Sequence, residues 1–360
     1  MSRSIEVNRD QRLDVLRTIG LLCIILAHVS PPKAIFQMRN FDVPLMVLIS
    51  GAAYCYSKSK ETYLKYLIKR ILRLVLPTWT FLSIYFVLFF FFAKIAGESY
   101  PYSIDQILKS YSLISGIGYV WVIRVFILCA MVIPIFSSLI NKIKNVKWYL
   151  LLLVFLYVIY EFSYRYLGEL NIQYANGILE YVVFYIFPYG CIAGFGLALH
   201  KLNRNTIVMA GILFLLIFLG MFCYYSMENG NIVWTQHYKY PARIYYISYA
   251  LAVSLLLYLI IGLLLRENVF IKMINSKPFR FFSSFTIWIY LWHILYVNLW
   301  ERILVERLPD KIHNFIIEYI FVLVFATITA LLQKIIVSNI IISLGPRLKL
   351  KALLTEMFLK

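Results

Sequence analysis

Charged residues are scarce in this sequence, and acidic ones are the scarcest. Only 14% of the 360 residues are charged, whereas 62% are hydrophobic, and the 17 Asp and Glu residues stand against 35 Lys and Arg. A water-soluble domain of this length could not bury so much apolar surface in one core. We therefore expect an integral membrane protein whose solvent is the lipid bilayer.

Signals for disulfides, repeats and a cleavable leader are also missing. The five cysteines lie inside apolar runs and not in paired loops, which argues against a disulfide framework. The first apolar run, Leu13 to Ser30, contains Asp14, Arg17 and His28 and no small-residue cleavage site, so we expect a retained first span. No repeat, low-complexity tract or soluble domain is visible, and the chain is expected to be a single membrane domain over residues 1–360.

The long apolar runs decide between helices and a closed barrel. They stay apolar for about 20 residues, enough for a helix to cross about 30 Å, whereas barrel strands would alternate. The sequence thus predicts an all-α integral membrane protein with a bundle of about ten transmembrane helices. The expected cores are Leu13 to Ser30, Phe41 to Tyr56, Leu74 to Ala96, Gly118 to Ile140, Trp148 to Tyr160, Tyr181 to His200, Ile207 to Ser226, Ile244 to Leu265, Phe281 to Trp300 and Phe315 to Val337.

The net charge of +18 sits in short clusters beside the apolar runs. Such clusters are typical of topology signals and anionic-lipid contact, and no nucleic-acid partner is expected. With both termini placed in the cytoplasm, roughly 22 of the basic residues are inside and about 10 outside, as the positive-inside rule requires. The predicted outer loops hold acidic and aromatic residues. These suit either an interfacial aromatic belt, which is favoured, or polar ligands outside.

The first span carries ionisable side chains, whose burial in the membrane costs free energy and therefore calls for a functional or structural explanation. Arg17 and His28 are eleven residues apart, so a continuous helix would bring them within roughly 20° of one face and about 16 Å along the axis. Arg17 could grip phosphate at the inner mouth, with Asp14 holding the guanidinium, and His28 could take a proton from a hydroxyl. Snorkelling of Arg17 and a helix contact of His28 are the alternatives, but the shared face favours function.

These residues also carry a resemblance to a known family. The arginine and histidine with ten residues between them are similar to the motif of the acyltransferase family 3 membrane enzymes. Four further segments resemble that family in the same order, namely DVPLMVLISG at 42–51, KRILRLVLP at 69–77, WVIR at 121–124 and SFTIWIYLWH at 284–293. The resemblance covers nearly the whole chain, and the ordered set is more specific than any single segment.

The resemblance implies a bundle of about ten spans that uses cytoplasmic acyl-CoA, with acetyl-CoA as the expected donor. It implies acylation of a saccharide hydroxyl on or across a bacterial cytoplasmic (inner) membrane, with His28 as the essential histidine and Arg17 as its partner. Many relatives carry an additional extracytoplasmic esterase-like domain. This chain is expected to be the stand-alone form, with acceptor choice made by the membrane domain or by a separate extracytoplasmic partner.

Other candidate site residues lie in the matching segments. His293 is expected at a depth similar to that of His28, either as a second proton site or as a helix contact, and Tyr290 is on the same segment. Trp121 and Arg124 are candidates for substrate binding, although Arg124 could instead snorkel. Ser50 beside Gly51 favours close helix approach over a role as nucleophile.

The expected mechanism holds the acyl-CoA phosphates with Arg17 and with the loop cations Arg70 and Arg73. His28 then acts either as general base or as a transient acyl carrier, and no metal is expected. A transporter or polymerase of polysaccharide or lipid-linked sugar is the alternative, with Pro188 as a candidate break in the sixth span. A membrane sensor or scaffold without catalytic activity is the third hypothesis.

Overall fold

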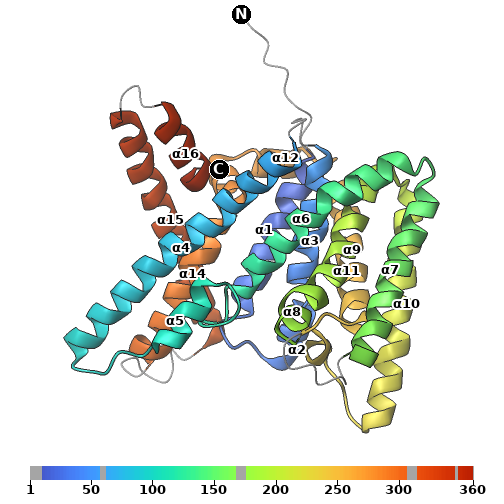
Figure 1. Ribbon diagram of the computed structural model, residues 1–360, viewed down its shortest axis with the longest axis horizontal. Helices are drawn as coiled ribbons and strands as arrows, with labels where there is room; N and C mark the ends of the chain where they lie inside the picture. Colours follow the sequence, from blue (N-terminus) through green and yellow to red (C-terminus); the bar gives the residue numbers. More distant parts are fainter. Residues whose placement is uncertain (1–9, 57–61, 168–175, 306–313, 345–347, 360) are drawn as a thin grey trace, which may run out of the picture. The chain divides into compact units, whose positions relative to one another are not determined.

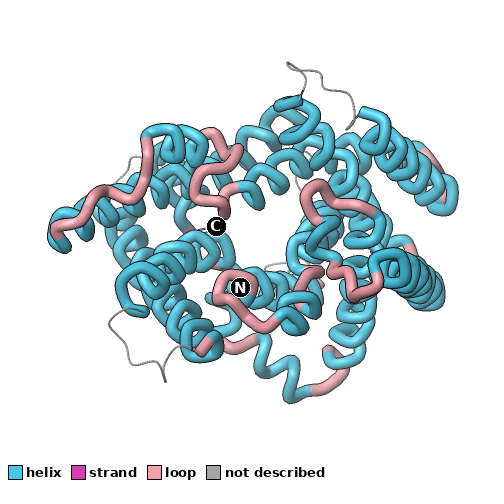
Figure 2. The backbone as a smooth tube through the Cα atoms, turned by 90° about the horizontal axis from the view of Figure 1, so that it is seen from below, coloured by secondary structure: helices cyan, strands magenta, loops and turns pink. Residues whose placement is uncertain are grey.

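The computed structural model describes residues 10–56, 62–167, 176–305, 314–344 and 348–359. It is 84% helix, and within those ranges it contains no strand. Figure 2 shows the described chain as helices joined by loops. The all-α prediction is therefore confirmed.

Seven helices of the described chain are long and apolar enough to cross a membrane, and they confirm seven of the ten predicted spans. They are Tyr63–Ala96, Trp121–Lys142, Val146–Tyr166, Leu179–Lys201, Arg204–Asn229, Ile244–Leu264 and Phe315–Ser343.

The other three predicted spans correspond to shorter helices: α1 (Gln11–Leu26), α3 (Asp42–Cys55) and α14 (Thr286–Leu299). With 14 to 16 residues, each covers less than about 25 Å of the membrane normal. α1 ends five residues before Pro31, in a segment where the proline pair disfavours helical backbone and Ser30 adopts a positive φ of 47°. The helix break at Phe285 shortens the predicted span Phe281 to Trp300.

The chain divides into two compact units. Unit 1 comprises the described residues of 1–24, 33–60 and 128–283, and unit 2 those of 25–32, 61–127 and 284–360. In unit 1, besides α1 and α3, the elements are α2 (Lys33–Met38), α7 (Val146–Leu167), α8 (Asn176–Ile178), η1 (Leu179–Val183), α9 (Phe184–Ala198), η2 (Leu199–Lys201), α10 (Arg204–Asn229), η3 (Thr235–Tyr238), α11 (Ile244–Leu264), α12 (Asn268–Ile274) and α13 (Lys277–Ser284). In unit 2, besides α14, they are α4 (Tyr63–Ala96), α5 (Ile104–Tyr111), η4 (Trp300–Leu304), α15 (Phe315–Ser343) and α16 (Leu348–Phe358), while α6 (Trp121–Lys142) contributes to both units.

The core of unit 1 is built by close packing of α3 on α9 (Figure 1). A Cβ atom at Gly51 would lie 2.0 Å from the carbonyl oxygen of Ala193, and one at Gly196 would lie 2.0 Å from that of Leu48. Only glycine permits backbones to approach this closely. α9 runs unbroken through Pro188, so the expected break in the sixth span is not at the proline. A π-helical turn, η1, precedes α9 instead.

In unit 2, α14 packs against both α4 and α15. Its residues from Trp288 to Leu295 are all buried. Trp292 donates its indole N–H to Gln333 of α15 at 2.6 Å, and the hydroxyls of Tyr296 and Thr329 lie 2.5 Å apart. Side-chain hydrogen bonds of this kind fix the rotation of a helix among its neighbours. α14 is therefore a rigid carrier for the side chains that it presents inside the unit.

Candidate active site

His28 lies in the turn that follows α1, not in the helix itself. The expectation that Arg17 and His28 share one helical face requires a helix that continues to residue 28, whereas α1 ends at Leu26. The helical period therefore no longer relates the two side chains, and that part of the prediction is wrong. The His28 amide donates to the Ile25 carbonyl at 3.0 Å, which closes the turn, and His28 itself is half-buried.

His293 lies close to His28 within unit 2. The centroids of the two imidazole rings are 5.4 Å apart and the rings are inclined by 32°. Two segments separated by more than 260 residues of sequence thus bring their only histidines together. The sequence predicted only a similar depth for the two histidines, and the role of His293 stays a prediction.

The tautomer of His293 follows from its hydrogen bond. Its Nδ1 is bonded to the backbone carbonyl oxygen of Tyr290, one turn earlier in α14. Because a carbonyl only accepts, Nδ1 carries the proton and Nε2 presents a lone pair. His293 is fully buried, and its Nε2 has no hydrogen-bond partner among the described residues. A buried ring nitrogen left without a partner is costly unless a substrate or another bound molecule uses it.

Tyr119 completes this cluster, and the sequence analysis missed it. Its ring centroid is 4.5 Å from that of His28 and 6.0 Å from that of His293, with edge-to-face geometry in both cases. Its hydroxyl is protonated at neutral pH, as is usual for tyrosine, and can donate a hydrogen bond. The sequence signal for Tyr119 was weak, because an aromatic residue at a predicted span end also fits the interfacial belt. We call His28, Tyr119 and His293 the histidine cluster.

Tyr290 and Arg124 hold the segment that carries Tyr119. The Tyr290 hydroxyl donates to the backbone carbonyl of Tyr119 at 2.6 Å. Arg124 is buried, and its Nη1 donates to the carbonyls of Leu113 and Ile114 at 3.3 and 2.8 Å. These contacts anchor both ends of the loop between α5 and α6. The substrate-binding roles of Tyr290, Arg124 and Trp121 stay predictions, and Trp121 is the half-buried first residue of α6.

Asp14 and Arg17 form an ion pair in unit 1. The Arg17 Nη1 donates to the Asp14 carboxylate at 3.0 Å, and both side chains are partly exposed. This contact is the one expected from their spacing of three residues. Whether the pair serves the donor stays a prediction.

Arg70 and Arg73, predicted as loop cations, lie in the amino-terminal part of helix α4 in unit 2, so their placement in a loop was wrong. The Arg70 guanidinium lies over the ring of Tyr66 at 5.1 Å. Arg73 donates to the Glu356 carboxylate of α16 at 2.7 Å from Nε and 2.5 Å from Nη2. Of the two, Arg70 is therefore the better candidate for phosphate, because an acidic partner already neutralises Arg73.

Ser50 has a local partner in α3. Its hydroxyl donates to the Met46 carbonyl, one turn earlier, at 2.8 Å. Together with the close approach at Gly51, this contact supports a packing role for the Ser50-Gly51 pair.

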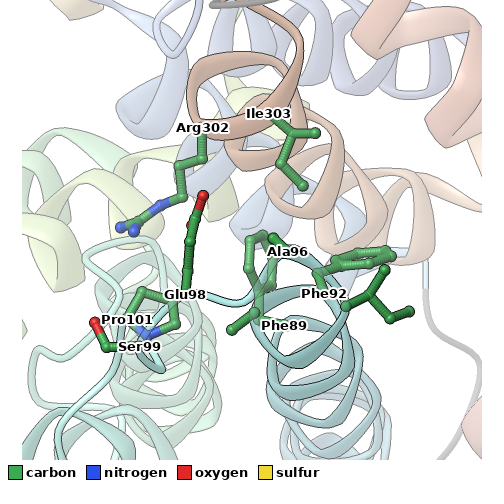
Figure 3. Close-up of a pocket in the computed structure, with 10 residues that line it drawn as sticks. Phe89, Phe92, Ala96, Glu98, Ser99, Pro101, Arg302 and Ile303 are labelled. Atoms are coloured by element: carbon green, nitrogen blue, oxygen red, sulfur yellow. The ribbon is translucent and has the colours of Figure 1, made fainter.

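A pocket of about 270 Å³ opens in unit 2 beside the ends of α4 and η4. Figure 3 shows Glu98 and Arg302 on one side of the pocket and Phe89 and Phe92 on the other. The Arg302 guanidinium lies 5.3 Å from the ring centroid of Tyr102 and also acts electrostatically on Tyr119. A ligand pocket commonly combines aromatic side chains with a few charged or polar groups that form hydrogen bonds, and a sugar can use both. We call this pocket the Glu98 pocket.

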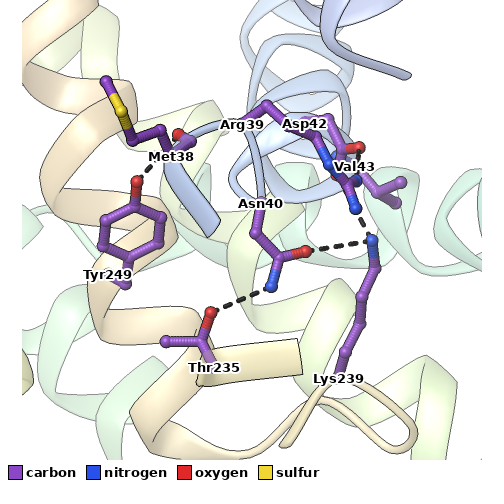
Figure 4. Close-up of polar contacts among 8 residues, drawn as sticks. All are labelled: Met38, Arg39, Asn40, Asp42, Val43, Thr235, Lys239 and Tyr249. Atoms are coloured by element: carbon purple, nitrogen blue, oxygen red, sulfur yellow. Dashed lines mark hydrogen bonds and ion pairs between the residues drawn. The ribbon is translucent and has the colours of Figure 1, made fainter. Parts of the chain in front are cut away.

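Unit 1 contains a buried charge cluster that sequence reasoning also missed. Arg39 donates to Asp42 at 2.6 Å, and the Lys239 Nζ lies 3.2 Å from the Asn40 Oδ1 and 3.5 Å from the Asp42 carboxylate (Figure 4). Asn40 donates to Thr235, whose hydroxyl donates to Gln37. We call these six residues the Asp42 cluster. Burial lowers the pKa of Lys239, in the loop before α11, to about 8, although Asp42 opposes the shift.

The described residues contain no group of three His, Cys, Asp or Glu side chains placed to hold a metal ion.

Comparison with known proteins assigns the chain to a family. Residues 10–333 match the acyltransferase domain of acyltransferase family 3, which covers most of the 360 residues. Neither the comparison with curated proteins nor that with solved structures gave a match. The family match agrees with the multi-helix membrane architecture. The chain belongs to the acyltransferase family 3 domain family, and it is a multi-pass membrane acyltransferase.

Proposed function

We propose that this protein transfers an acyl group, with acetyl as the first candidate, from cytoplasmic acyl-CoA to a hydroxyl of a cell-surface or lipid-linked saccharide. The expected setting is a bacterial inner membrane, and O-antigen, capsule and exopolysaccharide are the acceptor classes. The observation that carries the proposal is the histidine cluster, in which a buried imidazole presents an unpartnered Nε2 lone pair 5.4 Å, ring to ring, from a second histidine.

The chemistry needs one base and one hydrogen-bond donor. A histidine nitrogen takes the proton of the acceptor hydroxyl while the oxygen attacks the thioester carbonyl. The carbon–sulfur bond breaks, and the CoA thiolate takes up the proton to leave as the thiol. Tyr119 is placed to donate a hydrogen bond to the negatively charged carbonyl oxygen of the transition state.

The two histidines suit a division of this work. Two imidazolium ions at a ring distance of 5.4 Å would repel each other, so at most one of the two rings carries the added proton of an imidazolium. His293, with Nδ1 fixed on a carbonyl, is restricted to Nε2, while His28 is half-buried and lies in a turn. We assign the contact with the reacting hydroxyl to His28, either as base or as transient acyl carrier, and the proton-sharing role to His293.

The acceptor would bind in the Glu98 pocket. The Glu98 carboxylate would accept hydrogen bonds from sugar hydroxyls, and the Arg302 guanidinium would donate to them. Phe89 and Phe92 would supply apolar faces for the sugar ring. Arg302 links this pocket electrostatically to Tyr119 of the histidine cluster. A separate extracytoplasmic protein could present the acceptor there.

The decisive experiment replaces His28 with alanine. Acyl transfer, measured as O-acetyl groups on surface glycans by mass spectrometry or proton resonances, should fall at least about 100-fold because a general base is lost. His237→Ala is the matched control, since His237 is exposed in η3 of unit 1 and should retain full transfer.

Two results would contradict the proposal. One is a His28→Ala protein of normal abundance with full transfer. The other is a deletion strain that loses the whole polymer and not only its acyl groups, which would favour the transporter or polymerase alternative.

A further inference from the structure

A second pocket lies in unit 1, and its lining residues have no role in the sites described above. It has a volume of about 280 Å³, and its polar lining residues are Arg12, Tyr56, His200, Arg204, Tyr258 and Arg266. They come from four places in the sequence: the start of α1, the end of α3, the connection from α9 to α10, and the end of α11. In the predicted orientation all four places face the cytoplasm.

Among the described hydrogen bonds of the lining residues, one acidic side chain takes part, that of Asp10, and its carboxylate is already bound. Arg12 binds Asp10 through Nε and Nη2 at 2.6 to 3.0 Å, and the Tyr56 hydroxyl donates to the same carboxylate at 3.2 Å. The Arg12 guanidinium also lies 4.3 Å from the ring centroid of Tyr258. Arg12 and Asp10 therefore form a neutral, rigid wall.

Arg204 and Arg266 supply the uncompensated charge. Both side chains are exposed, and neither has an ion-pair partner among the described residues. Arg204 is also the first residue of the 26-residue α10, where the helix dipole adds positive partial charge. His200, whose Nδ1 lies 2.7 Å from the Leu197 carbonyl oxygen, adds a third nitrogen donor when it is protonated.

The wall formed by α11 leaves space for a ligand. Gly262 lines the pocket, and the nearest atom to a Cβ placed there is the Arg12 Cδ at 3.6 Å. Glycine costs helix stability in the interior of α11, about 1 kcal/mol relative to alanine. A larger side chain at residue 262 would occupy the mouth of the pocket.

We infer that this pocket, which we call the Arg204 pocket, binds a phosphate ester. Two arginines without carboxylate partners provide planar, bidentate donors, which match phosphate oxygens better than they match a neutral ligand. The volume accommodates a phosphate with one attached ring or glycerol unit. The phosphate could belong to a nucleotide or to an anionic phospholipid of the inner leaflet, and the chemistry recognised is the same. The nucleotide case rests on the proposed function, because adenosine 3′,5′-bisphosphate is the phosphorylated end of coenzyme A, whereas the phospholipid case does not; the transfer assay of His28→Ala tests the proposed function separately.

The test uses the full-length protein and two probes. Binding of adenosine 3′,5′-bisphosphate to the detergent-purified protein is measured by calorimetry. Retention of phosphatidylglycerol against phosphatidylcholine, after reconstitution and extraction, is measured by native mass spectrometry. We expect one probe to bind and the double variant Arg204→Ala/Arg266→Ala to weaken that binding at least about tenfold, since charge-assisted hydrogen bonds are lost. The probe that binds identifies the source of the phosphate.

Two further variants separate the pocket from general charge. Gly262→Leu keeps every cation but fills the pocket, and it should weaken the same probe, so a folding defect of the arginine variant would not leave the question open. Lys142→Ala/Lys144→Ala removes two exposed cations that do not line the pocket, and it should bind like the wild type. The inference is overturned if neither probe binds, if Gly262→Leu binds normally, or if the lysine variant loses as much binding as the arginine variant.

Discussion

The Asp42 cluster of unit 1 and the histidine cluster of unit 2 are both buried and polar, but their hydrogen bonds are distributed differently. Asp42 accepts from Arg39, from the Val43 amide at 2.7 Å and from Lys239, and each polar side chain of the cluster has at least one partner. In the histidine cluster, Nδ1 of the fully buried His293 has a hydrogen-bond partner, whereas its Nε2 has none in the part of the chain that the structure describes.

This difference separates structure from chemistry. The Asp42 cluster gives every charged side chain an oppositely charged partner, although the buried Arg39 Nε has no hydrogen-bond partner among the described residues. Such a network in a low-dielectric interior ties segments together, here residues near α3 with the loop before α11, which are about 200 positions apart. An unsaturated imidazole contributes little to stability, and its free nitrogen is available to a substrate. We therefore expect substitutions in the first cluster to act on folding and those in the second on catalysis.

The largest expected effect is on catalysis, from His293→Gln. Glutamine keeps a polar side chain of similar length but loses the imidazole, to which we assign proton sharing with His28. Acyl transfer should fall about 100-fold or more, while the melting temperature in detergent stays within a few degrees of the wild type. Transfer is measured with purified protein and a labelled acyl donor. A variant that unfolds but transfers normally per folded molecule would assign His293 to packing.

Asp42→Asn should have the largest effect on stability. It leaves Arg39 and Lys239 buried without their counter-charge, and breaking such a buried pair costs about 3–5 kcal/mol. The free energy of unfolding, measured by denaturant titration in mixed micelles, should fall by that amount. Asp105→Asn, whose side chain is exposed at the start of α5, serves as the control and should be neutral. Lost activity at unchanged stability would contradict the comparison.

How much of this could be predicted depended on the kind of signal. Seven spans were predictable because twenty consecutive apolar residues leave the backbone no alternative to a transmembrane helix. α1 and α14 were predicted too long, since hydropathy averages over the short breaks at residues 27–30 and at Phe285. Each of these helix breaks involves only a few residues, so a hydropathy average over about 19 residues does not detect it.

The residues of the candidate site were also predictable only in part. His28 and His293 were predictable as histidines in apolar segments, and the structure brings their rings together. Tyr119 was not, because tyrosine is common at span ends, and its proximity to the histidines depends on a loop held by Tyr290 and Arg124. The Asp42 cluster was missed for a related reason. Its members lie on separate segments, and no spacing rule connects Asp42 with Lys239.

Tyr290→Phe tests the comparison further. Tyr290 belongs to unit 2, which holds the histidine cluster, but its hydroxyl already has a hydrogen-bond partner. Loss of its hydroxyl leaves the Tyr119 carbonyl without that donor and loosens the loop. We expect unfolding to become easier by about 1 kcal/mol and transfer to slow about fivefold through kcat, with the KM for the donor unchanged. Tyr296→Phe, which removes a hydroxyl contact between α14 and α15, should affect stability alone. Equal losses of kcat in both variants would remove the positioning role.

The smallest expected effect concerns Lys239. Its folded-state pKa of about 8 lies below the ordinary value of 10.5, because burial disfavours the charged form. Between these two values the unfolded chain holds a proton that the folded protein lacks, so this residue makes the protein more stable as pH rises from 8 to 10.5, by up to about 1.4 kcal/mol per pH unit. Below pH 8 both states are protonated and the contribution is constant. In Lys239→Met the difference in unfolding free energy from the wild type should therefore change across this window, whereas exposed Lys147→Met should show no such change. A parallel pH dependence in wild type and Lys239→Met would mean that Lys239 stays charged and that the Asp42 cluster is a fixed ion network.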